Sequence, residues 1–139
     1  MLKLFLVSLF SFIPFLVVHG QNNKSVTSIE GEWLVHNEKS TVQVYQKEGK
    51  YFGKLAWVDP ADNPNEEKRR AIMGTLILEN LTPQGKALYK NGRVYNLPQD
   101  RHYDCDVKVK KDKMLITISI GWFSKTLVWT RVQNQYSQL

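Results

Sequence analysis

Gly31-Glu32-Trp33 and Trp129-Thr130-Arg131 stand near the two ends of this 139-residue chain, and together they decide its fold. Between the two triplets runs an unbroken series of short strand-like segments separated by turn signals. Regular spacing of this kind is typical of an all-β sandwich or barrel. A tryptophan on the first strand can meet an arginine on the last strand only if the sheet curls round on itself. The two triplets therefore predict a small closed β-barrel.

The strand pattern is clearest in the segment 101–110. Tyr103, Cys105, Val107 and Val109 alternate there with charged residues. Successive side chains of a strand point to opposite faces of the sheet. We therefore expect one face of this strand to pack in the core and the other to meet water.

Turn signals divide the rest of the chain into further strands. Asn91-Gly92 is the strongest short hairpin signal, and it predicts two strands, 87–90 and 93–97, on either side of a tight turn. Counting in this way gives about eight or nine sequential strands joined by short turns. Such an order favours an up-and-down antiparallel barrel over a Greek key.

The longest segment without strand character is 59–74. Asn63 and Pro64 are candidates to start a helix there, and acidic residues follow in what would be its first turn, where they suit the helix dipole. We expect a short helical excursion near residues 63–73, lying over one end of the barrel.

The first 20 residues are typical of an export signal rather than of folded structure. Lys3 supplies the positive start, an almost wholly apolar run from Leu4 to Val18 follows, and cleavage is expected between Gly20 and Gln21. The alternative is a membrane anchor, but the run is shorter than the roughly 20 residues that span a bilayer. We expect a periplasmic or extracellular protein with no transmembrane span once the signal is removed. The expected organisation is a signal peptide (1–20), a flexible leader (21–29), a β-barrel domain (30–133) and a polar tail (134–139).

Charge and cysteine content narrow the class of protein. The chain carries 19 basic and 13 acidic side chains, a formal net charge of +6. An exported chain seldom meets nucleic acid, so we expect no nucleic-acid partner, and the basic excess indicates either solubility or affinity for an anionic envelope surface. Cys105 is the single cysteine, which excludes an intramolecular disulfide. We expect a monomer whose core alone stabilises the fold.

No catalytic motif stands out. Asp100, His102, Asp104 and Asp106 lie two apart and share one strand face, but neighbours at this spacing are about 6.6 Å apart, which strains a single metal site. A solvated polar face explains them better, so we predict no catalytic residues, no metal and no cofactor. The sequence favours a non-enzymatic protein, although an enzyme with its site at the barrel mouth, using Asp59, Asp62 or His102, stays open.

Two resemblances follow from the order of the motifs. Gly31-x-Trp33 followed at the far end by Arg131 resembles lipocalin-like (calycin) barrels, in which such an arginine packs over the tryptophan. The chain from 31 to 132 resembles the small exported bacterial proteins of the domain of unknown function 2147 family. That family implies a fold and a compartment but no established activity. The motifs that carry the second resemblance are Gly31-x-Trp33, Val44-Tyr45, Gly49-x-Tyr51-x-Gly53-Lys54-x-x-Trp57, Gly74-x-x-Ile77-Leu78, Asn91-Gly92-x-x-Tyr95 and Trp129-x-Arg131.

The lipocalin-like resemblance implies that a small apolar or amphipathic molecule binds inside the barrel, with Trp33 and Arg131 as structural closure. Aromatic and apolar residues expected to face inward near the open end would line that site: Tyr45, Tyr51, Leu55, Trp57, Tyr95 and Tyr103. The alternative is that these residues fill the barrel as core, and that the protein is an envelope interaction or structural module acting through its outer basic surface. The basic residues concerned are Lys68, Arg69, Arg70, Lys108, Lys110, Lys111 and Lys113.

Overall fold

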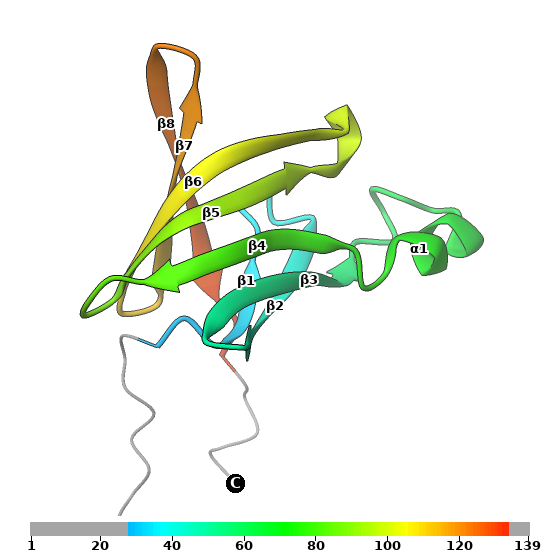
Figure 1. Cartoon of the computed structure of the whole chain (residues 1–139). Helices are drawn as coiled ribbons and strands as arrows, with labels where there is room; N and C mark the ends of the chain where they lie inside the picture. Colours follow the sequence, from blue (N-terminus) through cyan, green and yellow to red (C-terminus); the bar gives the residue numbers. More distant parts are fainter. Residues whose placement is uncertain (1–27, 134–139) are drawn as a thin grey trace, which may run out of the picture.

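A computed structural model describes residues 28–133 and shows a closed antiparallel barrel of eight strands (Figure 1). Each strand pairs with the next one along the chain, and the last pairs with the first. The predicted fold class, an all-β lipocalin-like up-and-down barrel with a short helical excursion, is confirmed. The elements are β1 (Gly31–Leu34), β2 (Ser40–Lys47), β3 (Lys50–Val58), α1 (Glu66–Ile72), β4 (Leu76–Pro83), β5 (Leu88–Asn96), the 3₁₀ turn η1 (Leu97–Gln99), β6 (Arg101–Lys110), β7 (Lys113–Ile120) and β8 (Phe123–Arg131).

Alternating apolar side chains make these segments strands with one buried face. On β6, Cys105, Val107 and Val109 are almost fully buried, while the charged residues between them are exposed. β-branched residues suit a pleated surface that is half buried, and burying one such side chain contributes roughly 1.5–3 kcal/mol. The inward faces of the strands therefore meet in one core along the barrel axis. Its largest fully buried side chains are Trp33, Trp129, Ile29, Leu78, Leu81, Met114 and Ile116.

Asn91-Gly92 does not form the predicted hairpin, which corrects the expectation of two strands at 87–90 and 93–97. β5 runs straight through this dipeptide, and its pairing with β6 shifts register between Tyr89 and Gly92, as at a β-bulge. Gly92 is required by packing, because a Cβ on it would lie 2.4 Å from Leu81 Cδ2. Asn91 takes the positive φ of the bulge, and its backbone N–H donates to Asp106 Oδ1.

One end of the barrel is sealed by Arg131. Its guanidinium lies over the Trp33 ring, with its central carbon 4.2 Å from the ring centroid, as expected from the sequence. Its two terminal nitrogens donate to the backbone oxygens of Glu30 (2.9 Å) and Ser28 (2.6 Å). Ile29 completes the seal: it is fully buried, and its carbonyl accepts from the Trp33 indole N–H. Sequence analysis placed Ile29 in a flexible leader, whereas the structure makes it part of the core.

The opposite end, called the mouth here, carries the irregular segments. Because consecutive strands are antiparallel, the β1–β2 loop, the α1 excursion, η1 and the β7–β8 turn all fall at this end. β1 has four residues and pairs with β8 at two positions, Trp33↔Arg131 and Leu34↔Thr130. β7 and β8 stay paired with each other as far as Ile120↔Phe123. Their hairpin therefore runs past the end of β1 and projects from the molecule (Figure 1).

Candidate ligand site at the barrel mouth

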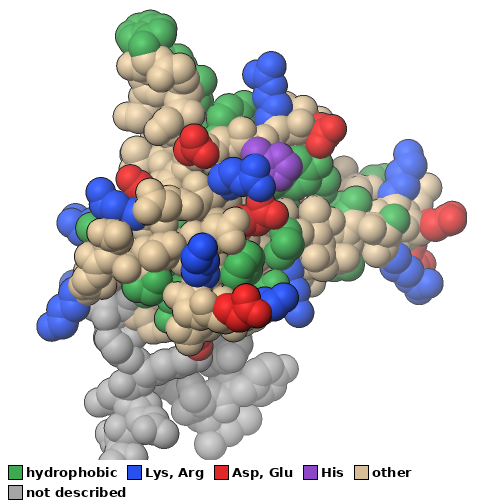
Figure 2. Space-filling model, viewed as in Figure 1, with side chains coloured by type: hydrophobic (Ala, Val, Ile, Leu, Met, Phe, Trp, Pro, Cys, Tyr) green, Lys and Arg blue, Asp and Glu red, His purple; other side chains and the backbone are tan. Residues whose placement is uncertain are grey.

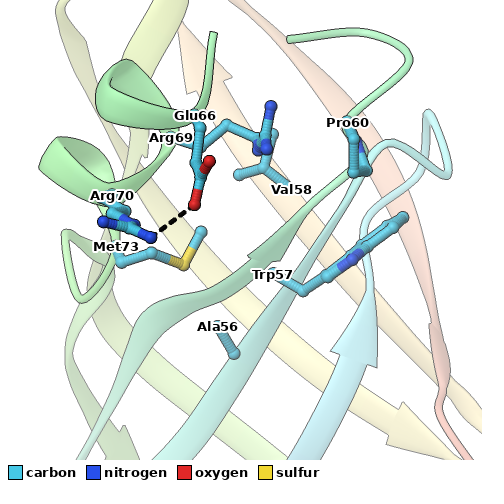
Figure 3. A pocket seen from close by; sticks show the side chains of 8 residues that line it. All are labelled: Ala56, Trp57, Val58, Pro60, Glu66, Arg69, Arg70 and Met73. Carbon is cyan, nitrogen blue, oxygen red and sulfur yellow. Dashed lines mark hydrogen bonds and ion pairs between the residues drawn. The ribbon is translucent and has the colours of Figure 1, made fainter. Parts of the chain in front are cut away.

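A cleft of about 270 Å³ opens at the mouth, between the end of β3 and the helix α1 (Figure 3). β3 and the start of the excursion supply one wall, and α1 with the residue after it supplies the other. The volume is slightly below the usual range of small-molecule pockets, which starts near 300 Å³. The cleft therefore suits a small molecule, or one part of a longer one. Its lining residues are Ala56, Trp57, Val58, Pro60, Glu66, Arg69, Arg70 and Met73.

Local sequence fixes α1 over this cleft. The Asn65 side chain caps the helix by accepting from the backbone N–H of Lys68 at 2.9 Å, so the expected excursion is confirmed with its first helical residue at Glu66. At the other end of α1, Ile72 packs against the core, and its carbonyl accepts from the Thr75 hydroxyl. These contacts hold a helix that has no fully buried residue of its own.

Two arginines form the polar side of the cleft. Arg69 donates from Nη1 to the carbonyl of Asn63 at 2.6 Å, and Arg70 pairs with Glu66 one helical turn earlier. Each guanidinium has five N–H donors, so both retain donors beyond these bonds. The cleft thus combines two cationic side chains with two exposed apolar ones, Trp57 from β3 and Met73 after α1, which are 41% and 37% exposed.

An ion pair ties the excursion to the neighbouring loop. Lys39, in the β1–β2 loop, donates from Nζ to Asp62 Oδ1 at 2.6 Å, and this hydrogen bond is the main reason that the pKa of Lys39 is raised. Both side chains are about half exposed. An exposed pair of this kind contributes little to stability, and its effect is to position the segment that starts the excursion.

The six candidate lining residues separate into three groups. Trp57 lines the cleft, and Leu55 is buried in the core beneath it. Tyr51 and Tyr103 are half-buried and pack against the core, but Tyr51 lies against Tyr89 in an edge-to-face pair (ring centroids 5.2 Å apart) near the closed end. The structure therefore brings only Trp57, of the six, to the cleft.

The expected inward orientation of Tyr45 and Tyr95 is wrong. Tyr45 neighbours the buried Val44, stacks on Phe52, and has the exposed Lys54 over its ring. Tyr95 stacks on the exposed His102, and its hydroxyl donates to Asp100, which raises the pKa of the tyrosine. Since side chains alternate along a strand, the burial of Val44 and Val94 leaves both tyrosines on the outer face.

The cleft thus lies at the rim of the barrel, whereas core side chains occupy the interior. Trp129 and the neighbouring core side chains fill the axis, and the indole N–H of Trp129 is buried with no hydrogen-bond partner among the described residues. Trp57 was predicted as a site residue, but Met73 and the two arginines that line the cleft with it were not. The sequence signal that could have identified the arginines is the basic run at the end of the helix. A helix at the mouth must bring some of its side chains to the rim, and here it brings Arg69 and Arg70.

The polar residues considered for chemistry have structural contacts instead. Asp100 accepts from Tyr95, His102 stacks on that ring, and Asp106 accepts from the backbone of the β5 bulge. Burial raises the pKa of the Cys105 thiol to about 12, so the reactive thiolate form is scarce at neutral pH. Across residues 28–133, no group of three His, Cys, Asp or Glu residues is close enough to hold a metal ion.

The basic residues do not form one surface. Arg69 and Arg70 lie on α1 at the mouth, whereas Lys110, Lys111 and Lys113 flank the β6–β7 turn at the closed end. The single patch considered in the sequence analysis is therefore two separate groups. Each is interrupted by carboxylates, Glu66 and Glu67 on α1 and Asp112 in the turn.

A closed eight-stranded barrel with an arginine over the first-strand tryptophan defines a lipocalin-like protein. Comparison with solved structures agrees: protein HP1028 from the human pathogen Helicobacter pylori, described as belonging to the lipocalin family, is 25% identical and superposes with a TM-score of 0.63 over 77% of this chain and 84% of that one. The chain belongs to the family described as uncharacterised proteins conserved in bacteria (DUF2147), whose model matches residues 31–131. No curated protein matches the sequence. In the part of the chain that the structure describes, no helix has the length and hydropathy to cross a membrane.

Proposed function

We propose that this protein is a non-enzymatic carrier or sensor that binds a small amphipathic molecule with an anionic group at the mouth of its barrel. The observation that carries the proposal is the cleft itself, whose lining contains an exposed tryptophan and methionine together with two arginines. An apolar moiety against Trp57 and Met73 would remove apolar surface from water, at roughly 25 cal/mol per Å². An anionic group would take the free guanidinium donors of Arg69 and Arg70.

The second part of the proposal is that the protein is exported. The apolar run at residues 4–18 predicts an export signal that is removed before Gln21, which would place the barrel outside the cytoplasm. N-terminal sequencing of the protein recovered from the cell envelope tests this. A mature protein that retains Met1 contradicts it.

Binding is tested with a fluorescent amphipathic anion, a dansylated long-chain fatty acid, titrated into the protein and followed by its emission. Trp57→Ala and the double variant Arg69→Gln, Arg70→Gln are each expected to weaken binding about tenfold, because the first removes an apolar contact and the second removes the cationic contacts. Tyr95→Phe, on the outer face, is the matched control and should bind as the parent does.

Two results would overturn the proposal. One is unchanged affinity in both cleft variants, and the other is affinity that falls equally in the control. A dansylated alcohol of the same chain length separates the two kinds of contact, since it should bind more weakly than the acid and should be insensitive to the arginine substitutions. Native mass spectrometry of the protein isolated from cells then identifies the natural ligand by mass.

A further inference from the structure

The β7–β8 hairpin ends in two exposed aromatic side chains. Trp122 is 95% exposed and Phe123 is 48% exposed, and their rings make an edge-to-face pair with centroids 5.4 Å apart. In the space-filling view the hairpin carries a hydrophobic cap at its far end, beyond the rest of the surface (Figure 2). We call Trp122 and Phe123 the aromatic tip.

Folding alone does not account for this tip. A side chain that is 95% exposed gains almost nothing from the core, and clustered exposed apolar side chains mark sites of interaction. The tip also lies outside the cleft between β3 and α1, so binding of a small ligand there does not involve it.

The charge of this region points to an anionic partner. From Lys113 to Leu139 the sequence contains no aspartate or glutamate, while Lys125 follows the tip by two residues. Lys125 pairs with Ile118 across the hairpin and is exposed. An apolar tip with a cation behind it and no carboxylate on its own hairpin matches the interfacial layer of a bilayer that contains anionic lipids.

The area of the tip argues against a protein partner. Two aromatic side chains bury at most about 500 Å² together, whereas a stable protein interface takes about 800 Å² from each side. Partition into a membrane interface has no such threshold, because tryptophan is favoured at the headgroup level even as a single residue.

We propose that the aromatic tip anchors this protein on anionic membranes, with Trp122 and Phe123 inserted among the lipid headgroups and Lys125 close to the phosphates. Insertion stops near Phe123, since in the described part of the chain β1 pairs with β8 only at Thr130 and Arg131. The backbone edge of β8 between Phe123 and Val128 therefore needs water and cannot enter hydrocarbon. The tip and the cleft lie at the same end of the barrel, so the anchored protein would hold its mouth toward the membrane.

The test uses the chain from Gln21 onward, which retains every strand and every buried residue of the barrel. Co-sedimentation is measured with vesicles of phosphatidylcholine alone and with vesicles that also contain phosphatidylglycerol. The parent protein is expected to bind the mixed vesicles, and Trp122→Ala, Phe123→Ala is expected to lose about tenfold or more in partition. Brominated lipids should quench the parent's tryptophan emission, and this quenching should disappear in Trp122→Phe, which identifies the inserted ring.

Val128→Ala is the matched control, because Val128 is a 43% exposed apolar residue on the same strand. It lies five residues from Phe123, about 16 Å along the strand, beyond the roughly 5–10 Å depth of an interfacial contact. Equal binding by the tip variant and the parent overturns the proposal. The proposal is also overturned if neutralising Lys68, Arg69 and Arg70 abolishes vesicle binding while the tip is intact. A concentration-dependent dimer that requires Trp122 would overturn it as well. Every variant is first checked for an unchanged circular dichroism melting curve.

Discussion

Arg131 joins three parts of the closed end through a single side chain. It covers the Trp33 ring and donates to two backbone carbonyls that lie 101 and 103 residues earlier in the chain. Each hydrogen bond contributes about 1 kcal/mol, and the cation–π contact contributes roughly 0.5–2 kcal/mol. Burial lowers the pKa of the guanidinium, but an arginine stays charged throughout the working pH range.

Arg131→Ala is therefore expected to lower the free energy of unfolding by about 2–4 kcal/mol in urea titrations. Arg131→Lys should recover only a small part, since an ammonium group cannot donate to both carbonyls in the fork geometry. Arg93→Ala is the control, because the half-exposed Arg93 forms a single ion pair, with Glu79, and it should cost about 1 kcal/mol or less. Equal losses in the two alanine variants would contradict the role given to Arg131.

Gly92 shows how one residue can point to the wrong local structure. In the sequence it reads as half of a hairpin turn, but a glycine is needed there because of Leu81, which lies eleven positions earlier and leaves no room for a Cβ. A Cβ would come within 2.4 and 2.8 Å of two carbons of Leu81, which is fully buried. That contact joins β4 to β5, and no local sequence pattern around Gly92 predicts it.

Gly92→Ala is expected to destabilise the fold by about 1–3 kcal/mol through overpacking. Leu81→Ala alone should cost about 2–5 kcal/mol because it leaves a cavity. The double variant should cost clearly less than the sum, since the new methyl group fills part of that cavity. Additive losses in a double-mutant cycle would show that the contact does not explain the glycine.

At the scale of the element, α1 is a short helix at the edge of the barrel. It has no fully buried residue, and its start depends on the Asn65 cap. Asn65→Ala should destabilise the helix by about 1 kcal/mol while leaving global unfolding nearly unchanged. Faster amide exchange confined to residues 59–75 would be the expected signature, and uniformly faster exchange would contradict it.

His36, in the β1–β2 loop, has a lowered pKa. The pKa of His36 is lowered first by burial and second by Lys125. Because the folded state disfavours protonation, the stability that His36 contributes is present above its unfolded pKa of about 6.5 and is lost as the pH falls below that value.

His36→Gln should accordingly flatten the decrease in stability between pH 7 and pH 5, measured by urea titration at each pH. Lys125→Gln should raise the NMR titration midpoint of His36 without restoring its ordinary value, since burial is the larger cause. A midpoint unmoved by Lys125→Gln would show that the two groups do not interact.

For the whole molecule, the sequence predicts the barrel architecture well, but it predicts poorly which side chains face the core and which face solvent. Barrel closure followed from Trp33 and Arg131, and the strand bounds of β6 match the expected segment 101–110. These features depend on alternation and on motif order, which a single chain displays. Tyr45 and Tyr95 were misplaced because an aromatic residue suits either face of a strand, and each follows a valine, Val44 or Val94, that takes the inward position.

The candidate site was less predictable for a related reason. Of the predicted lining residues Trp57 lies at the cleft, but its companions come from α1 and the residue after it, and the placement of α1 depends on long-range contacts such as Ile72 with the core. Filling of the barrel axis by Trp129 and Met114 was likewise not visible in the pattern, since inward-facing residues look the same in a hollow barrel and in a filled one.

The two-position pairing between β1 and β8 has a consequence for the order of folding. Its partners are separated by about seven-tenths of the whole sequence, whereas every other strand pair joins immediate neighbours in the chain. Loop-closure entropy must be overcome before so distant a contact contributes any stability. During synthesis the first strand therefore has to wait for the last, and the ring can shut only after Arg131 has left the ribosome.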